Sequence, residues 1–255
     1  MSTVKQAGEI CLKSFQKIEA AAIHYKSTVD MVTDVDLSVQ RFLKERFTGK
    51  FPEITFLGEE GEEPVEEGPQ GLFIVDPLDG TTSYVQGLPF YCVSVAYRIR
   101  GKTQLGVVYA PSLDLLYHAE RGRGAFCNGR PITVSSVGSL IESVAGVSFG
   151  CVRHRVKPDT LPLLDSLIYG LKDIRRFGSI AIDLCLVADG RFDLFWGFNA
   201  YPWDIAAGVL IVQEAGGTVT DLAGGSAFEA SQQIAASNGR VHSDFIEIAR
   251  EFLQA

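Results

Sequence analysis

One short segment constrains the fold of this chain more than any other, because an apolar run in it turns abruptly acidic. Residues 72–75 are continuously apolar, as expected of a strand that is buried on both faces of a sheet. Asp76 and Asp79 follow, three residues apart, and Pro77 between them fixes the turn and removes one amide hydrogen. The Leu78 carbonyl can turn inward beside the two carboxylates, and Mg²⁺ prefers such oxygen ligands. The segment predicts a buried strand that ends in a magnesium site.

Three small residues follow the second carboxylate. Gly80, Thr81 and Thr82 stand where a helix can begin, and the backbone amides and dipole at a helix start favour a phosphate oxyanion. The alternative is purely structural, with Asp79 as a helix N-cap and Asp76 as a turn former. That alternative is the commoner one for a bare D-x-x-D pattern. The preceding strand and the following Gly-Thr-Thr favour adjacent metal and phosphate sites.

Acidic residues elsewhere in the chain suit the same site. Glu59 directly follows a predicted strand, whereas the acidic residues 60–67 are expected to form a solvated loop. Asp204 opens a predicted helix, where an N-cap role is compatible with metal binding. Asp36 lies in the first turn of a helix that starts near Thr33, and the T-x-x-D pattern resembles a capping box. For Asp36 the structural and the catalytic interpretation are both open.

The periodicity of apolar residues predicts two packed lobes, an α+β lobe and an α/β lobe. The first lobe, residues 1–138, carries most of the candidate ligands. The second, residues 139–255, supplies Asp204 and the substrate end of the pocket, and the join is expected near residues 135–142. Residues 121–131 are rich in glycine and are expected to form turns. The expected helices span residues 1–25, 33–49, 161–169, 180–188, 205–215 and 244–253, and the expected strands 54–57, 72–75, 91–99, 104–109, 115–119, 143–149, 174–177, 192–196 and 218–221.

Composition narrows the class of function. The 255 residues carry a net charge of −8, without the basic excess that nucleic-acid binding requires. No segment approaches the roughly 20 apolar residues of a membrane helix, and the N-terminus lacks the features of a signal peptide. The five cysteines are scattered and form no C-x-x-C pair, which fits a reducing cytoplasm and argues against a zinc or disulfide scaffold. A basic cluster at Arg153, Arg155 and Lys157 is expected to be a solvated loop.

Taken together, the segments resemble the inositol monophosphatase family, lithium-sensitive magnesium phosphatases with a layered αβαβα sandwich fold. The resemblance spans nearly the whole chain, in family order and at family-like spacing. The matching segments are Lys26 with residues 30–36, Gly58-Glu59-Glu60, residues 76–82, residues 203–208 and residues 214–217.

The resemblance implies that the chain binds two or three Mg²⁺ ions and hydrolyses a small phosphate monoester by in-line displacement with metal-activated water. It also implies a homodimer. Asp36 and Thr81, with Glu59, correspond to the residues that position and activate the attacking water. The implied metal ligands are Glu59, Asp76, Asp79, Asp204 and the Leu78 carbonyl. The implied substrate contacts are Gly80, Thr81, Asp79, Asp204, Ile180 and Lys26.

Two positions depart from the family pattern at the sugar end of the pocket. Inositol-specific members carry a Glu six residues before the Trp of the Trp-Asp motif, and Gly197 stands there in this chain. Many members carry Ala where Ile180 stands. Inositol 1-phosphate or a similar polyol or sugar phosphate is therefore the first expectation. Histidinol phosphate, fructose bisphosphate and 3′-phosphoadenosine phosphates are the alternatives. Asn199 or the pair Arg175-Arg176 could supply substitute contacts, although a surface or subunit contact is an equal alternative for the arginines.

Two rival functions of other classes can be drawn from the sequence. Residues 146–150 match the G-x-S-x-G elbow of serine hydrolases, with Ser148 as nucleophile. Only His242 follows at a suitable place for a triad, together with Asp183 or Asp204. The other rival is a non-catalytic binding protein with a vestigial metal site. Every position of the implied metal site carries the expected residue type, which argues against the loss of metal binding.

Overall fold

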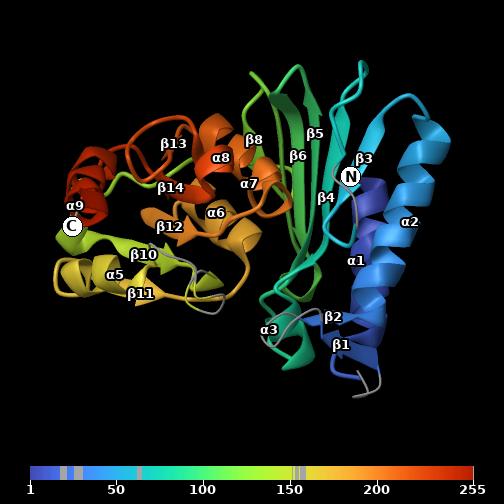
Figure 1. Cartoon of the computed structure of the whole chain (residues 1–255), viewed down its shortest axis with the longest axis horizontal. Helices are drawn as coiled ribbons and strands as arrows, with labels where there is room; N and C mark the ends of the chain where they lie inside the picture. Colours follow the sequence, from blue (N-terminus) through green and yellow to red (C-terminus); the bar gives the residue numbers. More distant parts are fainter. Residues whose placement is uncertain are drawn as a thin grey trace.

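The computed structural model of the chain describes residues 1–17, 22–25, 31–61, 65–150, 152, 155 and 159–254, and its elements stack in alternating layers (Figure 1). Two helices cover the outer face of the first sheet, two helices separate the first sheet from the second, and two more cover the far face of the second. These layers confirm the αβαβα sandwich. In order, the layer helices are α1 (Ser2–Ser14) and α2 (Asp34–Lys50), then α6 (Ile180–Ala188) and α7 (Pro202–Glu214), then α5 (Leu161–Leu167) and α9 (His242–Gln254).

The first sheet has seven strands in the order β3-β4-β5-β6-β7-β8-β9. Only β3 and β4 pair in parallel; the other neighbours are antiparallel. The apolar run of β4 is buried on both faces: Leu72 and Ile74 pack toward α6 and α7, whereas Phe73 and Val75 pack toward α1 and α2. The strands are β3 (Thr55–Gly58), β4 (Leu72–Asp79), β5 (Cys92–Ile99), β6 (Lys102–Ala110), β7 (Leu115–Glu120), β8 (Ala125–Cys127) and β9 (Arg130–Ile132).

The second sheet has five strands in the order β11-β10-β12-β14-β13. β10 pairs in parallel with β11 and β12, and the remaining pairs are antiparallel. Its outer face packs on Leu163 and Leu167 of α5 and on Phe245 and Ile246 of α9. The strands are β10 (Val144–Val147), β11 (Asp173–Arg175), β12 (Leu194–Phe198), β13 (Thr218–Thr220) and β14 (Gln233–Ser237).

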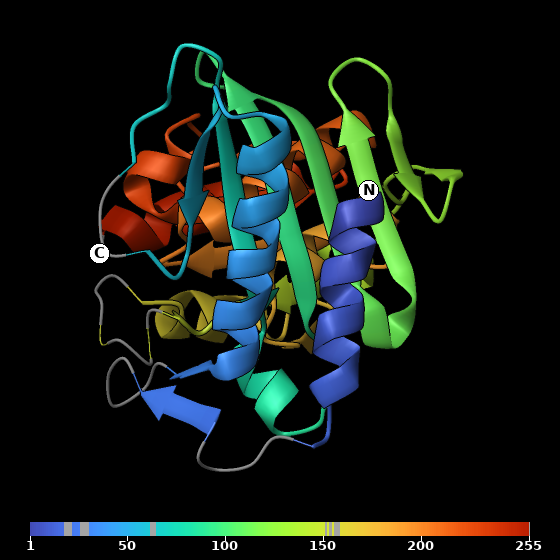
Figure 2. The ribbon, with the colours of Figure 1, turned by 90° about the vertical axis from the view of Figure 1, so that its right-hand side faces the viewer.

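The central helix α7 joins the two sheets closely. A Cβ added to Gly106 of β6 would lie 2.7 Å from the carbonyl oxygen of Ala207, so only a glycine allows this strand to approach the helix so closely. On the opposite face of the first sheet, α1 and α2 lie side by side (Figure 2). The division into lobes at residues 1–138 and 139–255 stays a prediction. None of the helices in the described ranges combines the length and the apolarity that crossing a bilayer requires.

Short elements complete the fold. A two-stranded antiparallel pair lies near the start of α2, and α3 follows β4 directly. These elements are β1 (Ile23–Tyr25), β2 (Met31–Thr33), α3 (Thr81–Val85), α8 (Phe228–Ser231) and the 3₁₀ turns η2 (Pro111–Leu113) and η3 (Leu140–Glu142).

Two expectations were wrong. The helix expected over residues 1–25 ends at Ser14, because Phe15 leaves the helical region and packs its ring against Tyr84 and Tyr91. Residues 23–25 form a strand instead. The segment expected to form turns, residues 121–131, contains the strand β8 and most of the strand β9. These strands were missed because each has three residues and the glycines of the adjoining turns dominate the local sequence.

Candidate active site

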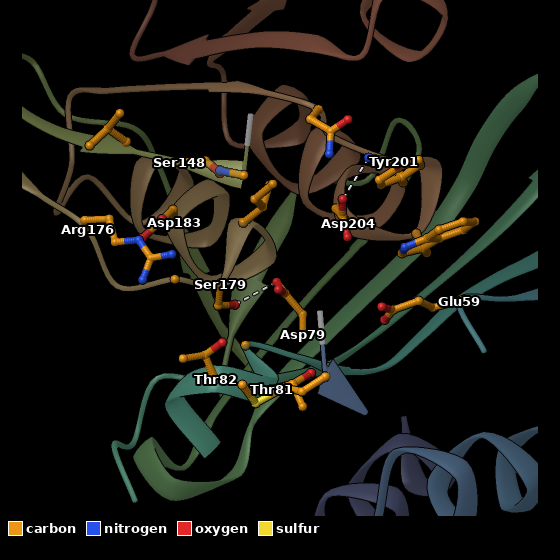
Figure 3. Close-up of a pocket in the computed structure, with 18 residues that line it drawn as sticks. Glu59, Asp79, Thr81, Thr82, Ser148, Arg176, Ser179, Asp183, Tyr201 and Asp204 are labelled. Atoms are coloured by element: carbon orange, nitrogen blue, oxygen red, sulfur yellow. Dashed lines mark hydrogen bonds between the residues drawn. The ribbon is translucent and has the colours of Figure 1, made fainter. Parts of the chain in front are cut away.

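A pocket of about 410 Å³ opens where elements of both sheets and the central helices meet (Figure 3). Four segments distant in sequence contribute to its wall. They are Glu59 after β3, residues 79–82 after β4, residues 178–180 before and at the start of α6, and residues 203–204 in the first turn of α7. The pocket brings together most of the residues that the sequence singled out.

Asp76 is the buried centre of a cluster of carboxyls. Its Oδ1 accepts a 2.9 Å hydrogen bond from the Leu78 amide, so the turn-forming role is real. Burial is the largest cause that raises the pKa of Asp76 well above its ordinary value. The next causes are the negative charges of Glu59, Asp79 and Asp204, and a hydrogen bond with the Glu59 carboxyl adds to the rise. These acids therefore lie within electrostatic reach of one another.

The pairing of β3 with β4 places Glu59 beside this cluster. Gly58 is paired with Val75, and the Glu59 amide donates a 3.0 Å hydrogen bond to the Val75 carbonyl. The ladder thus continues one residue past β3 and brings Glu59 level with Asp76. Glu59 therefore follows the end of a strand at the sheet edge, as the sequence predicted.

Asp79 connects the first sheet to the start of α6. Its Oδ2 accepts hydrogen bonds from Ser179 Oγ and from the Ala181 amide, both at 2.7 Å. Burial raises the pKa of Asp79 to about 6 although these donors oppose the rise. The N-cap of α3 is Gly80 and no side chain caps it, so the N-cap alternative for Asp79 was wrong.

Asp204 lies in the first turn of α7, one residue after Trp203. Its Oδ2 accepts a 2.7 Å hydrogen bond from the Tyr201 amide, which stabilises the helix start. Figure 3 shows Asp204, Asp79 and Glu59 around one side of the pocket. The N-cap of α7 is Tyr201, so the N-cap role expected for Asp204 was wrong; Asp204 instead closes a capping box from the third position of the helix while it lines the pocket.

Asp36 accepts a hydrogen bond from the side chain of Thr81, which lies 45 positions away in the sequence. Thr81 Oγ1 lies 3.2 Å from both Asp36 Oδ1 and the Leu78 carbonyl oxygen. Asp36 Oδ2 accepts from the Thr33 amide at 2.9 Å and from the Thr33 hydroxyl, so the capping box is confirmed. Burial raises the pKa of Asp36 to about 6. The capping role of Asp36 is therefore present, and its hydrogen bond with Thr81 connects it to the pocket wall, while its catalytic role stays a prediction.

Gly80 permits the turn between β4 and α3. Its φ is 94°, a left-handed conformation that favours glycine. An added Cβ would also lie 2.6 Å from the Phe90 carbonyl oxygen. Gly80, Thr81 and Thr82 all line the pocket, where the sequence placed the phosphate.

The substrate end of the pocket is only partly as expected. Ile180 and Asn199 line the pocket, whereas Gly197 is buried in β12 behind its wall. An added Cβ at Gly197 would lie 3.2 Å from the Ser148 Cβ and 3.3 Å from the Phe195 ring. Ser148, which lines the pocket, thus crowds the place of the acid found in inositol-specific members. Lys26 lies outside the described residues.

The donor chemistry of the cluster fits a divalent cation. Buried carboxyls whose mutual repulsion raises their pKa are stabilised by a hard cation between them. Within the described ranges, however, no three His, Cys, Asp or Glu side chains already form a closed ligand set. Asp79 and Asp204 each accept a hydrogen bond from a backbone amide at the start of a helix. Binding of a cation would require their side chains to rotate toward a common point.

The base that the serine-hydrolase alternative requires, His242, is engaged elsewhere. The ring nitrogens of His242 hydrogen-bond to Thr220 Oγ1 at 3.0 Å and to Ser237 Oγ at 2.9 Å, so this His does not serve Ser148. The sequence did not predict that Ser179 donates a hydrogen bond to Asp79. A signal was available, since Gly-Ser before an apolar helix is a typical N-cap pattern.

Comparisons with known proteins agree over the length of the chain. The model of the inositol monophosphatase family matches residues 1–254. Inositol monophosphatase 3 of Solanum lycopersicum is 38% identical, over 98% of this chain and 95% of that protein. Nus factor SuhB of Pasteurella multocida (strain Pm70) is 36% identical, over 95% of this chain and 91% of that protein.

Solved structures show the same likeness. The native crystal structure of extragenic suppressor protein suhB from Bartonella henselae matches with a TM-score of 0.91 and 36% identity, over 97% of this chain and 95% of that one. An IMPase/NADP phosphatase complexed with NADP and Ca²⁺ matches with a TM-score of 0.85 and 27% identity, over 97% of this chain and 92% of that one.

Proposed function

The chain belongs to the inositol monophosphatase family of phosphatases, and from that premise we propose that it hydrolyses a phosphate monoester of a small polyol or sugar in the described pocket. One observation carries the proposal: the buried Asp76 interacts electrostatically with Glu59, Asp79 and Asp204 at the wall of that pocket. Such a concentration of negative charge disfavours an anionic substrate unless cations offset it.

The proposed cofactor is Mg²⁺, with two or three ions per site. When bound, the ions would supply the positive charge that activates water and stabilises the leaving oxygen. The residues proposed to hold them are Glu59, Asp76, Asp79, Asp204 and the Leu78 carbonyl. The complex of a family relative with Ca²⁺, another hard cation, supports this assignment.

The remaining residues of the proposed site would orient the attacking water, accept its proton and bind the substrate. Thr81 Oγ1 and Asp36 Oδ1, 3.2 Å apart, are proposed to orient the attacking water and accept its proton. The turn at Gly80 and Thr81 is proposed to hold the phosphate. Ile180 at the start of α6 limits the space for the leaving alcohol. Lys26 is proposed as a further cation near the site.

A phosphate-release assay tests the proposal directly. Wild-type protein is expected to release phosphate from inositol 1-phosphate or a related monoester with Mg²⁺ and to lose this activity in excess chelator. Asp76→Asn is expected to abolish the activity. Asp165→Asn, on the exposed face of α5, is the matched control and is expected to retain it. Equal rates with and without chelator would contradict metal dependence.

Several finer expectations belong to the same proposal. Inositol 1-phosphate is the first substrate to test, and histidinol phosphate, fructose bisphosphate and 3′-phosphoadenosine phosphates are the alternatives. Lithium inhibition and a homodimer are proposed from the family resemblance. The cytoplasmic location stays a prediction from the cysteines. Cys11, Cys92, Cys127 and Cys185 are buried free thiols.

A second function is suggested by the relatives named Nus factor SuhB or putative Nus factor SuhB, which are 35–37% identical to this chain. The name indicates a role in transcription, which would need a binding surface rather than the pocket. The net charge of −8 argues against direct nucleic-acid binding. Asp76→Asn separates the two functions, since a transcriptional role independent of catalysis survives this substitution in a complementation assay.

A further inference from the structure

Two neighbouring arginines, Arg175 and Arg176, point to different surroundings. The Arg175 guanidinium pairs with Asp173 and donates a 3.0 Å hydrogen bond to the Ile174 carbonyl at the end of β11. It does not line the pocket. Arg176 lines the pocket, and its Nη1 lies so close to Gly178 that an added Cβ there would be 2.9 Å away. The structure thus places Arg176 in the pocket and Arg175 outside it, a difference that the sequence did not predict.

Arg176 lies on the side of the pocket opposite Glu59, away from the acidic cluster (Figure 3). Among the described residues that line the pocket, Arg176 alone carries a positive charge. Asp183 lies beside it, buried to 1% exposure, and its Oδ1 has no hydrogen-bond partner within the described part of the chain. Burial and then the charge of Asp79 raise the pKa of Asp183, and the charge of Arg176 opposes the rise. The Arg176 guanidinium therefore lies within electrostatic reach of Asp183.

No carboxylate faces the substrate from position 197, where inositol-specific relatives carry one. Gly197 is buried, and a side chain there would require Ser148 or Phe195 to move. The pocket residues nearest this position along β10 and β12, Ser148 and Asn199, are uncharged. A leaving group that reaches this end therefore meets neutral hydrogen-bonding groups and the charge of Arg176.

We infer that Arg176 is a specificity-determining residue that binds a second anionic group, a carboxylate or a phosphate, on the alcohol part of the substrate. Arginine suits this role because its planar guanidinium donates paired hydrogen bonds to such oxyanions. The inference rests on the proposed phosphatase function, because it assigns the substrate class of the same pocket. The acidic cluster, with its proposed cations, binds the phosphate that is cleaved. Arg176 binds the anionic group at the opposite end of the substrate.

A matched pair of substrates isolates the second anion. Glycerol 2-phosphate and 2-phosphoglycerate share one carbon skeleton and differ by a hydroxymethyl group in place of a carboxylate. Wild-type protein is expected to hydrolyse both and to favour 2-phosphoglycerate. The preference is expected to shrink as salt rises, because Arg176 is exposed and its charge is screened. A purely structural role of Arg176 would not produce this salt dependence.

Substitutions then assign the preference to one side chain. Arg176→Gln is expected to lower kcat/KM for 2-phosphoglycerate about tenfold, mainly through KM, and to change glycerol 2-phosphate hydrolysis by less than about twofold. Arg176→Lys is expected to retain part of the preference, because it keeps the charge but loses the paired geometry. Arg175→Gln, which alters the neighbouring arginine outside the pocket, is expected to leave both rates unchanged.

The outcomes separate the inference from the function beneath it. Hydrolysis of both substrates with a ratio that Arg176→Gln does not change would overturn the inference and leave the phosphatase function standing. An equal loss on both substrates, or the same loss in Arg175→Gln, would also overturn it. If the wild-type protein hydrolysed neither these substrates nor the inositol, histidinol, fructose and phosphoadenosine phosphates, the proposed function itself would fail, and the inference with it.

Discussion

Ser179 Oγ donates a 2.7 Å hydrogen bond to Asp79 Oδ2, and the two residues are 100 positions apart in the sequence. The same hydroxyl accepts a 3.2 Å hydrogen bond from the Ile182 amide and so caps α6. The Ala181 amide donates to the same oxygen of Asp79. The start of α6 therefore holds the carboxylate of Asp79, which lines the pocket.

Replacing Ser179 with Ala removes both interactions. The lost cap is expected to lower the free energy of unfolding by about 1 kcal/mol. The loss of the Ser179 donor leaves Asp79 Oδ2 held by the Ala181 amide and less firmly oriented, so the affinity for Mg²⁺ or the activity is expected to fall by about 10-fold or more. Thermal melting and a Mg²⁺ titration of phosphate release measure the two effects. Ser179→Thr keeps the hydroxyl and serves as the control.

The two readouts distinguish positioning from simple stability. If Ser179→Ala lowers the melting temperature but leaves the Mg²⁺ titration and kcat unchanged, Ser179 only caps the helix. If Ser179→Thr is as impaired as Ser179→Ala, then space at this position, rather than the hydrogen bond to Asp79, accounts for the loss.

Asp76→Asn is expected to stabilise the protein in the absence of divalent cations while it abolishes activity. The raised pKa of Asp76 means that its ionised form is disfavoured in the folded protein, so a neutral side chain relieves repulsion. At pH 8 and without cations, the free energy of unfolding is expected to rise by about 1–2 kcal/mol. Added Mg²⁺ is expected to raise the melting temperature of the wild-type protein much more than that of the variant. A variant that is less stable than the wild type without cations would contradict this account.

The fold could be predicted from the sequence wherever one element carries a strong local signal. The apolar run before Asp76 predicted the buried β4, and residues 180–188, closed by Gly190, predicted the bounds of α6. β14, which lies between β12 and β13, was missed. Its residues 233–237 include small alanines, and they form a strand because neighbouring strands pair with them on both sides. Pairing between distant segments is not visible in local periodicity.

The same distinction applies to the site. The acids around Asp76 were predictable because they follow strand ends or open helices. The hydrogen bond from Ser179 to Asp79 and the position of Arg176 in the pocket were not, because both depend on how α6 packs against the first sheet. Glu214 shows the reverse case. It belongs to a segment of the family resemblance, yet its carboxylate accepts hydrogen bonds from the Gly122 and Gly124 amides and holds a hairpin turn.

Gly80→Ala is expected to destabilise the protein and to abolish activity. A non-glycine residue is strained at a φ of 94°, and the added Cβ would also lie 2.6 Å from the Phe90 carbonyl oxygen. We expect a loss of about 2–4 kcal/mol in the free energy of unfolding, measured by denaturant titration. Gly129→Ala is the matched control, because its φ is 75° and nothing lies within 4 Å of the added Cβ. The control is expected to lose about 1 kcal/mol and to keep its activity. Equal losses in the two variants would show that the contact with Phe90 has no effect.

His242 is expected to contribute a loss of stability as the pH drops below about 6.5, opposite in sign to buried carboxyls such as Asp36 and Asp79, whose raised pKa values favour the folded state as the pH falls. Burial lowers the pKa of His242 from its ordinary value of 6.5, and its ring nitrogens are engaged by Thr220 and Ser237. The unfolded chain takes up a proton at this residue near pH 6.5, whereas the folded chain resists it until a lower pH. In that window the unfolded state binds more protons at His242, so the contribution of this residue to the free energy of unfolding decreases with falling pH, by at most about 1.4 kcal/mol per pH unit.

His242→Asn tests this sign, because the amide keeps a donor and an acceptor but does not titrate. The variant is expected to be less stable than the wild type at pH 8, since the smaller side chain leaves space and reaches Thr220 poorly. Because the positive contribution of His242 is lost, the slope of the variant's free energy of unfolding against pH between 5 and 7 is expected to be lower than that of the wild type, and denaturant titrations at a series of pH values measure the two slopes. The difference between the slopes isolates His242 from the carboxylates, whose contributions are common to both proteins. Parallel curves would show that His242 takes up its proton equally in the folded and unfolded states, and a more positive slope in the variant than in the wild type would reverse the sign derived from burial.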